Sequence, residues 1–129
     1  MSTIGFIGLG IMGKPMAKNL LAGGLSLVVY DVVSAAVDEV VAAGAAKGTS
    51  PKDVAEKSDI VVTMLPNSPH VREVVCGKNS ILEGTKKGQI VVDMSSIAPL
   101  ASRELGAMLA EKGAEMLDAI NPAIRTVHD

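Results

Sequence analysis

Short runs of apolar residues alternate along the chain with segments in which apolar side chains recur at every third or fourth position. The short runs are rich in valine, isoleucine and leucine, which is typical of strands buried on both faces of a sheet. The predicted strands span residues 4–8, 25–31, 59–65, 89–94 and 114–117. The periodic segments between them predict helices over residues 11–22, 35–43, 51–57, 69–75 and 99–112.

The ends of the predicted helices coincide with residues that commonly begin or end a helix. Gly23 and Gly24 follow the first helix, and Gly44 follows the second. Ser50 stands as an N-cap before Pro51, which suits the first helical position. Strands and helices that alternate at this spacing predict an α/β fold of the Rossmann type. We expect a doubly wound, mostly parallel sheet with helices on both faces, truncated at its C-terminal end.

The composition supports a folded domain and argues against binding to nucleic acid. Of the 129 residues 48% are hydrophobic but only 2% are aromatic, so the core must consist of aliphatic side chains. The net charge is −2, and acidic and basic residues are mixed along the chain. The sequence has neither the basic patch nor the aromatic platform on which nucleic-acid recognition depends.

Other classes of protein are disfavoured by what the sequence lacks. Cys76 is the only cysteine, so no disulfide can form within the chain, and a lone cysteine is more often a small buried side chain than a catalytic thiol. No apolar run approaches the roughly 20 residues that cross a bilayer. The apolar start has no basic region before it, unlike a signal peptide. We expect a cytoplasmic protein without a metal site.

Residues 8–15, GLGIMGKP, join the first predicted strand to the first helix and fit two phosphate-binding patterns in part. The P-loop pattern requires a lysine followed by a serine or threonine that binds magnesium. Lys14 is in place, but Pro15 occupies the position of the hydroxyl group and cannot supply that ligand. A nucleoside triphosphatase is therefore the weaker interpretation.

The second pattern is the dinucleotide-binding fingerprint G-x-G-x-x-G, which needs a strand before it, a helix after it and an acidic residue about 20 positions on. Gly8 allows the sharp exit from the strand, Gly10 lets a pyrophosphate approach the backbone, and Gly13 lets the helix pack close to the sheet. The acidic residue is Asp31, at the end of the second strand. The predicted cofactor-binding residues in this part of the chain are Gly8, Leu9, Gly10, Ile11, Met12, Gly13 and Asp31.

Asp31 also favours NAD over NADP as the cofactor. Its carboxylate can accept hydrogen bonds from the ribose hydroxyls of the adenosine half and would repel a 2′-phosphate. No lysine or arginine follows it before Lys47 to hold such a phosphate. We therefore expect NAD to be preferred, while NADP remains possible if another loop supplies the positive charge.

Three segments resemble the β-hydroxyacid dehydrogenase family. They read GFIGLGIMGKPMAKNLL, DIVVTMLPNSPHV and VVDMSSIAPLASREL, and the resemblance extends from residue 1 to about residue 119. Within the family they are most similar to the 2-hydroxy-3-oxopropionate (tartronate semialdehyde) reductases, with 3-hydroxyisobutyrate dehydrogenases as close relatives. The resemblance implies hydride transfer from NAD(P)H to 2-hydroxy-3-oxopropionate, which yields glycerate.

The resemblance also implies further site residues. Leu65 and Pro66, at the carboxyl end of a predicted strand, would line the cofactor cleft. Ser96 would lie near the nicotinamide ribose or the substrate carboxylate, although an N-cap before Pro99 explains it equally well. His70 falls where relatives carry an asparagine that contacts the cofactor, and a solvated histidine is the alternative.

The family's catalytic lysine lies on a helix at the junction with a second, all-helical domain. This sequence follows the family as far as MLDA and then departs from it. We expect residues 1–119 to form an incomplete NAD-binding domain, residues 120–129 to be a divergent tail, and no catalytic residue to lie in this chain. A non-catalytic NAD-binding or self-assembling module, or a remnant of a reductase, is the alternative. We also expect a homo-oligomer through an uncovered sheet edge or the last helix.

Overall fold

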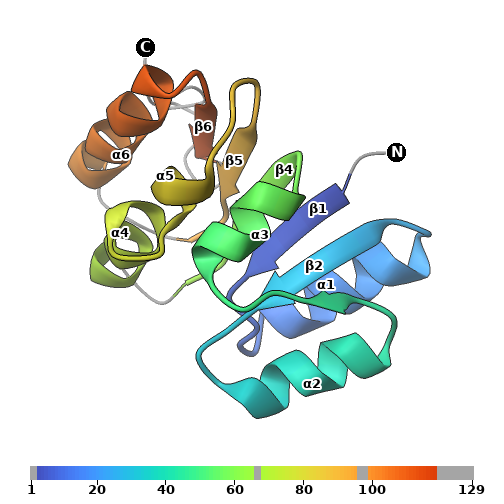
Figure 1. Ribbon diagram of the computed structural model, residues 1–129. Coiled ribbons are helices and arrows are strands. Elements are labelled where there is room, and N and C mark those ends of the chain that lie inside the picture. The colour runs from blue at the N-terminus through green and yellow to red at the C-terminus, as the bar shows by residue number, and fades with distance from the viewer. Residues whose placement is uncertain (1–2, 66–67, 96–98, 119–129) are drawn as a thin grey trace.

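The computed structural model describes residues 3–65, 68–95 and 99–118, whose strands form one sheet with helices packed on both sides (Figure 1). The strands are β1 (Thr3–Ile7), β2 (Ser26–Tyr30), β3 (Ala46–Lys47), β4 (Ile60–Thr63), β5 (Ile90–Asp93) and β6 (Glu115–Asp118). The helices are α1 (Gly13–Ala22), α2 (Ser34–Ala42), α3 (Pro51–Lys57), α4 (Ser68–Cys76), α5 (Ile81–Gly84) and α6 (Pro99–Glu111).

All neighbouring strands of the sheet run parallel, in the order β3-β2-β1-β4-β5-β6. Along the chain, β2 and β3 follow on one side of β1, and β4 then lies on the other side of β1. Ile7 therefore lies between Tyr30 of β2 and Thr63 of β4. A crevice forms at the carboxyl ends of strands where the order reverses, and this is the usual ligand site in such sheets.

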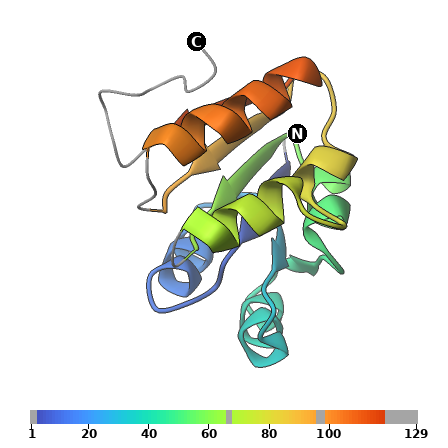
Figure 2. The same ribbon diagram turned by 90° about the vertical axis from the view of Figure 1, so that its left-hand side faces the viewer.

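Alternate residues of the central strands pack on opposite faces of the sheet. Phe6 and Val29 belong to a core cluster with Val37 and Val40 of α2, together with residues of α1. Their neighbours Ile7 and Val28 belong to the other cluster, formed with residues of α3, α4 and α6. In both views α2 and α6 lie at opposite ends of the molecule (Figures 1 and 2). The sheet is thus covered on both faces, as parallel sheets require.

The predicted fold class is confirmed, and each predicted strand and helix is present. The structure adds β3 and α5, which are too short to leave a periodic pattern in the sequence. The first helix begins at Gly13 rather than at residue 11, so Ile11 and Met12 lie in the loop before it. This shift matters for the site, because both side chains are largely exposed there.

Two predictions about the outside of the domain remain untested. β6 forms one edge of the described sheet, but the predicted self-association through this edge or through α6 remains a prediction. The predicted tail, residues 120–129, lies outside the described residues. In the ranges that the structure covers, no helix combines the length and apolar character needed to span a bilayer.

Candidate functional site

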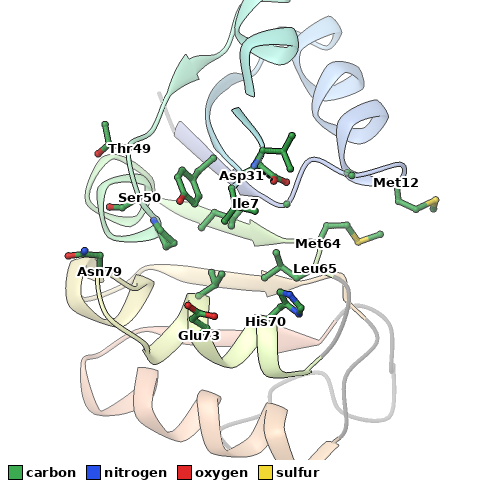
Figure 3. A pocket seen from close by; sticks show the side chains of 18 of the residues that line it. Ile7, Met12, Asp31, Thr49, Ser50, Met64, Leu65, His70, Glu73 and Asn79 are labelled. Carbon is green, nitrogen blue, oxygen red and sulfur yellow. Dashed lines mark hydrogen bonds between the residues drawn. The ribbon is translucent and has the colours of Figure 1, made fainter. Parts of the chain in front are cut away.

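A cleft of about 740 Å³ opens at the carboxyl ends of β1, β2 and β4, where the strand order reverses (Figure 3). One wall is formed by the loop after β1 and the residues after β2, and the other by the end of β4 and by α4. Its lining includes Gly8, Gly10, Gly13, Asp31, Leu65 and His70. The structure thus brings most of the predicted site residues together.

The three glycines of the loop have different surroundings. Gly8 has φ +104°, and a Cβ atom there would lie 2.1 Å from the carbonyl oxygen of Met64. At Gly13 a Cβ atom would lie 1.9 Å from the carbonyl oxygen of Gly8, which shows how closely α1 begins against the end of β1. A Cβ atom at Gly10 would have no protein atom within 4 Å. Gly8 and Gly13 are therefore required by packing, whereas the open space at Gly10 is available to a ligand.

Asp31 follows β2 and is held by two backbone amides. The N–H of Leu9 donates to Oδ2 at 2.6 Å, and the N–H of Val33 donates to Oδ1 at 2.9 Å. A carboxylate has about four acceptor positions, so these two bonds leave capacity for hydroxyl groups of a ligand. The Leu9 side chain is buried in the core and does not line the cleft. Leu9 therefore acts through its backbone, by orienting Asp31.

Four apolar side chains on this wall are exposed although they line the cleft. Ile11 and Met12 of the glycine loop are 92% and 63% exposed, and Val32 and Val33 after Asp31 are 88% and 55% exposed. Apolar surface gathered around a few fixed polar groups is typical of cofactor clefts. The expected roles of Ile11 and Met12 in cofactor binding are compatible with this position.

The opposite wall contains residues that the sequence analysis did not single out. Glu73 and Val74 of α4 line it together with Lys78 and Asn79. Thr49 and Ser50 complete the cleft between the two walls. Ser50 also caps α3, because its Oγ accepts a hydrogen bond from the N–H of Asp53 at 3.1 Å. The sequence predicted Ser50 only as a helix cap, because β3, which brings Thr49 and Ser50 to the carboxyl edge of the sheet, has only two residues and leaves no pattern.

The predicted residues beyond β4 and β5 are only partly described. Leu65 lines the cleft, and its N–H donates to Oγ of Ser95 at 2.6 Å. His70 lies beside Leu65 on the wall that faces the glycine loop (Figure 3). Pro66 and Ser96 lie outside the described residues, so their assignment stays a prediction.

Lys14, the residue that suggested a P-loop, is directed away from the cleft. Its Nζ lies 3.2 Å from Oε1 of Glu39 on α2, and it is not among the lining residues. Glu39 also pairs with Lys18, and hydrogen bonds from Lys18 and Lys14 lower the pKa of this carboxyl group. The residues that the structure describes contain no cluster of histidine, cysteine and acidic side chains arranged for a metal. This geometry gives no support to a triphosphatase site.

The similarity to known proteins agrees with this site. A family model described as the NAD binding domain of 6-phosphogluconate dehydrogenase matches residues 3–120. Human 3-hydroxyisobutyrate dehydrogenase, named as mitochondrial, is 47% identical over 116 residues, covering 90% of this chain and 34% of that protein. The NAD-dependent L-serine dehydrogenase of Pseudomonas aeruginosa is 44% identical over 119 residues, covering 92% of this chain and 40% of that protein.

A solved structure extends the likeness to three dimensions. That of Mycobacterium tuberculosis 3-hydroxyisobutyrate dehydrogenase with L-serine has a TM-score of 0.83 and 33% sequence identity, and covers 92% of this chain and 40% of that one. The chain thus spans 34–40% of the length of these three relatives. They are named for substrates other than 2-hydroxy-3-oxopropionate, so the predicted resemblance is confirmed for the family and not for that substrate. The cytoplasmic location likewise stays a prediction.

The glycine loop, the anchored carboxylate at the end of β2 and the match over residues 3–120 agree on one assignment. The open space at Gly10 and the spare acceptor capacity of Asp31 fit a pyridine dinucleotide. The chain belongs to the 6-phosphogluconate dehydrogenase-like β-hydroxyacid dehydrogenase family and carries its pyridine-nucleotide-binding Rossmann domain.

Proposed function

We propose that the chain binds NAD(H) in preference to NADP(H), in the cleft between the glycine loop and α4. The pyrophosphate would lie over Gly10 and the N-terminus of α1, where free N–H groups and the helix dipole favour negative charge. The adenosine ribose would be held by Asp31. The observation that carries the proposal is the pair of amide hydrogen bonds that fix the Asp31 carboxylate at the cleft.

The preference for NAD follows from the surroundings of Asp31. A 2′-phosphate placed near this carboxylate would meet like charge, and the next residues, Val32 and Val33, are apolar and exposed. Lys14, the nearest lysine after the glycine loop, is paired with Glu39. Among the lining residues that the structure describes, Lys78 is the lysine, and it belongs to the opposite wall. We expect it to contribute little to discrimination between the two cofactors.

The reaction that the cofactor would serve is a reduction of a small hydroxy-oxo acid. When bound, the nicotinamide supplies the hydride, and the protein must orient the acid and move a proton. The relatives are named for 3-hydroxyisobutyrate and L-serine, and the sequence resemblance suggests 2-hydroxy-3-oxopropionate. We propose that residues 1–119 hold and orient the cofactor, that Pro66 and Ser96 belong to that site, and that none of this chain's residues acts as the proton donor.

The first test is a titration of the 129-residue chain with NADH and, separately, NADPH. The chain has no tryptophan, so the fluorescence of the nicotinamide can be followed with little protein background. We expect saturable binding, at least roughly tenfold tighter for NADH, which corresponds to about 1.4 kcal/mol. Equal affinity, or tighter binding of NADPH, would overturn the proposed preference. Binding of neither would overturn the proposed site.

A variant and an activity assay complete the test. Lys78→Met removes the cation of the opposite wall, and we expect the ratio of NADPH to NADH affinity to change less than about twofold. A larger loss of NADPH binding would assign the 2′-phosphate to Lys78. An assay of the chain with NADH and 2-hydroxy-3-oxopropionate should give no turnover, and measurable glycerate would show that a proton donor lies within this chain.

A further inference from the structure

Asp93, the last residue of β5, holds the ends of two neighbouring strands together. Its side chain is fully buried, and its Oδ1 accepts hydrogen bonds from Oγ1 of Thr63 at 2.9 Å and from the N–H of Ser95 at 3.0 Å. Ser95 in turn accepts a hydrogen bond from the N–H of Leu65 through its Oγ, at 2.6 Å. Through these bonds Asp93 fixes both the segment that follows β4 and the segment that follows β5.

The hydrogen bonds among Thr63, Asp93, Ser95 and Leu65 form a network under the half of the cleft opposite Asp31. Thr63 pairs with Asp93 across β4 and β5, and with Ile7 across β4 and β1. Leu65, two positions further, lines the cleft, and in Figure 3 it faces the glycine loop from the wall opposite Asp31. A dinucleotide bound at a switch point spreads one nucleotide over each half of the sheet. The half over β4 and β5 is left for the nicotinamide nucleotide.

We propose that Asp93 is a positioning residue for the nicotinamide half of the cofactor, acting through the backbone at Leu65 and Ser95. This inference rests on the proposed NAD site. A carboxylate suits the role because one oxygen can accept from both the Thr63 hydroxyl and the Ser95 amide. An asparagine oxygen could accept from the same two groups, but without the negative charge both bonds would be weaker, and its amide N–H groups would take the buried place of the second carboxylate oxygen.

Gln89, the residue just before β5, offers a matched control. It is 2% exposed, and its Nε2 donates to the carbonyl oxygens of Ala55 at 2.8 Å and Ser58 at 2.9 Å. It therefore anchors neighbouring elements as Asp93 does, but at the amino end of β5, away from the cleft. Gln89→Met removes this buried anchor without touching the carboxyl edge of the sheet.

The test compares NADH with ADP-ribose, which has the same adenosine diphosphate but no nicotinamide. Dissociation constants are measured by calorimetry for the wild type, Asp93→Asn and Gln89→Met. We expect the wild type to bind NADH more tightly than ADP-ribose. In Asp93→Asn we expect NADH binding to weaken roughly tenfold or more while ADP-ribose binding changes less than about threefold. In Gln89→Met both constants should change by the same factor, although the melting temperature falls.

Each other outcome has a definite meaning. Equal weakening of both ligands in Asp93→Asn, or no change in either, would overturn the positioning role and leave the NAD site intact. A wild type that binds neither ligand would overturn the NAD site itself, and the role of Asp93 with it. If Asp93→Asn does not fold, Thr63→Val and Ser95→Ala each remove one hydroxyl group of the network. These variants must then show the selective loss of NADH affinity, and equal loss of both ligands would again overturn the proposal.

Discussion

The N–H of Leu9 and the carboxylate of Asp31 are joined by a hydrogen bond of 2.6 Å that links the turn after β1 to the end of β2. The same carboxylate accepts from the N–H of Val33, so both of its oxygens are oriented by the backbone. Asp31 is therefore part of the folded frame of the cleft as well as a candidate ligand of the ribose. Its two roles can be separated, because one changes stability and the other changes cofactor affinity.

Replacement of Asp31 by alanine should lower both the stability of the fold and the affinity for NADH. The amides of Leu9 and Val33 lose their acceptor, which should reduce the free energy of unfolding by about 1–3 kcal/mol. NADH should bind at least roughly tenfold more weakly, because hydrogen bonds to a charged acceptor are lost. NADPH should lose less, so the preference for NADH should shrink. Chemical denaturation and nicotinamide fluorescence measure the two effects.

The control for charge is Asp38→Asn, on the exposed side of α2. It removes one negative charge but no contact of the cleft, so NADH affinity should change less than about twofold. If Asp38→Asn matched the Asp31 variant, net charge would explain the loss rather than the ribose site.

Alanine at Gly10 should weaken cofactor binding without loss of stability, whereas alanine at Gly13 should destabilise the fold. A Cβ atom at Gly10 meets no protein atom within 4 Å, so Gly10→Ala should keep the wild-type melting temperature. It should nevertheless weaken NADH binding by roughly tenfold or more, because the methyl group occupies the space proposed for the pyrophosphate. At Gly13 the Cβ atom would lie 1.9 Å from the carbonyl oxygen of Gly8, and a loss of about 1–3 kcal/mol in unfolding free energy is expected. Unaltered NADH binding by Gly10→Ala would exclude the proposed pyrophosphate position.

Asp53 should make stability depend on pH in the acidic range. The N–H of Thr49 donates to its Oδ2 at 2.9 Å and Lys57 lies 3.1 Å from Oδ1; the amide bond first and the lysine second hold the pKa of Asp53 below its ordinary value of 3.8. A lowered pKa stabilises the fold fully above about 3.8 and loses that effect as the pH falls through the folded-state value.

The measurement is the difference in unfolding free energy between the wild type and Asp53→Asn at pH 7 and at pH 3. We expect the difference to be larger at pH 7 and to shrink at pH 3. Ser50→Ala removes the hydroxyl cap of the same helix, and its cost of about 1 kcal/mol should not vary with pH. A pH-independent difference for Asp53→Asn would mean that its charge contributes nothing.

Gly48 and Val54 should be energetically coupled. A Cβ atom at Gly48 would lie 2.5 Å from Cγ2 of Val54, so Gly48→Ala should destabilise the fold by about 1–3 kcal/mol. Val54→Ala also destabilises, because it empties part of the buried core. The double variant should be destabilised by about 0.5–3 kcal/mol less than the sum of the two single variants. As a control, the destabilisation by Gly23→Ala and by Val54→Ala should be additive. If the effects of Gly48→Ala and Val54→Ala were additive too, this packing would be contradicted.

Most of the fold could be predicted because its signals are local. Continuous aliphatic runs mark β1, β2, β4 and β5, and the glycines and Ser50 mark helix ends. The glycine loop and Asp31 could be predicted because a local fingerprint joins them, although they are 18 or more residues apart. The sequence did not reveal that Leu9 anchors Asp31, because a backbone hydrogen bond leaves no trace in the side chain.

The rest of the site depends on long-range packing. Glu73, Val74 and Lys78 reach the cleft because α4 packs against the sheet beside β4, and nothing in their local pattern indicates a ligand. Asp93 lies inside a predicted strand without a signal of its own, and only the pairing of β4 with β5 brings it to Thr63. The start of α1 was placed two residues early because Ile11 and Met12 continue its apolar pattern, although they lie in the loop before it.

From the surroundings of Gly8 we expect an order of events during synthesis of the chain. Its N–H donates to the carbonyl oxygen of Tyr30 at 3.1 Å, and its Cα faces the carbonyl oxygen of Met64. On a ribosome β1 can pair with β2, and α1 can pack against them, early in synthesis. The turn at Gly8 reaches its final surroundings only after Met64 has emerged and β4 has paired with β1. A nascent chain arrested before that point should therefore bind nucleotide more weakly than the released chain, and a nucleotide in the cell would mainly stabilise chains that have passed it.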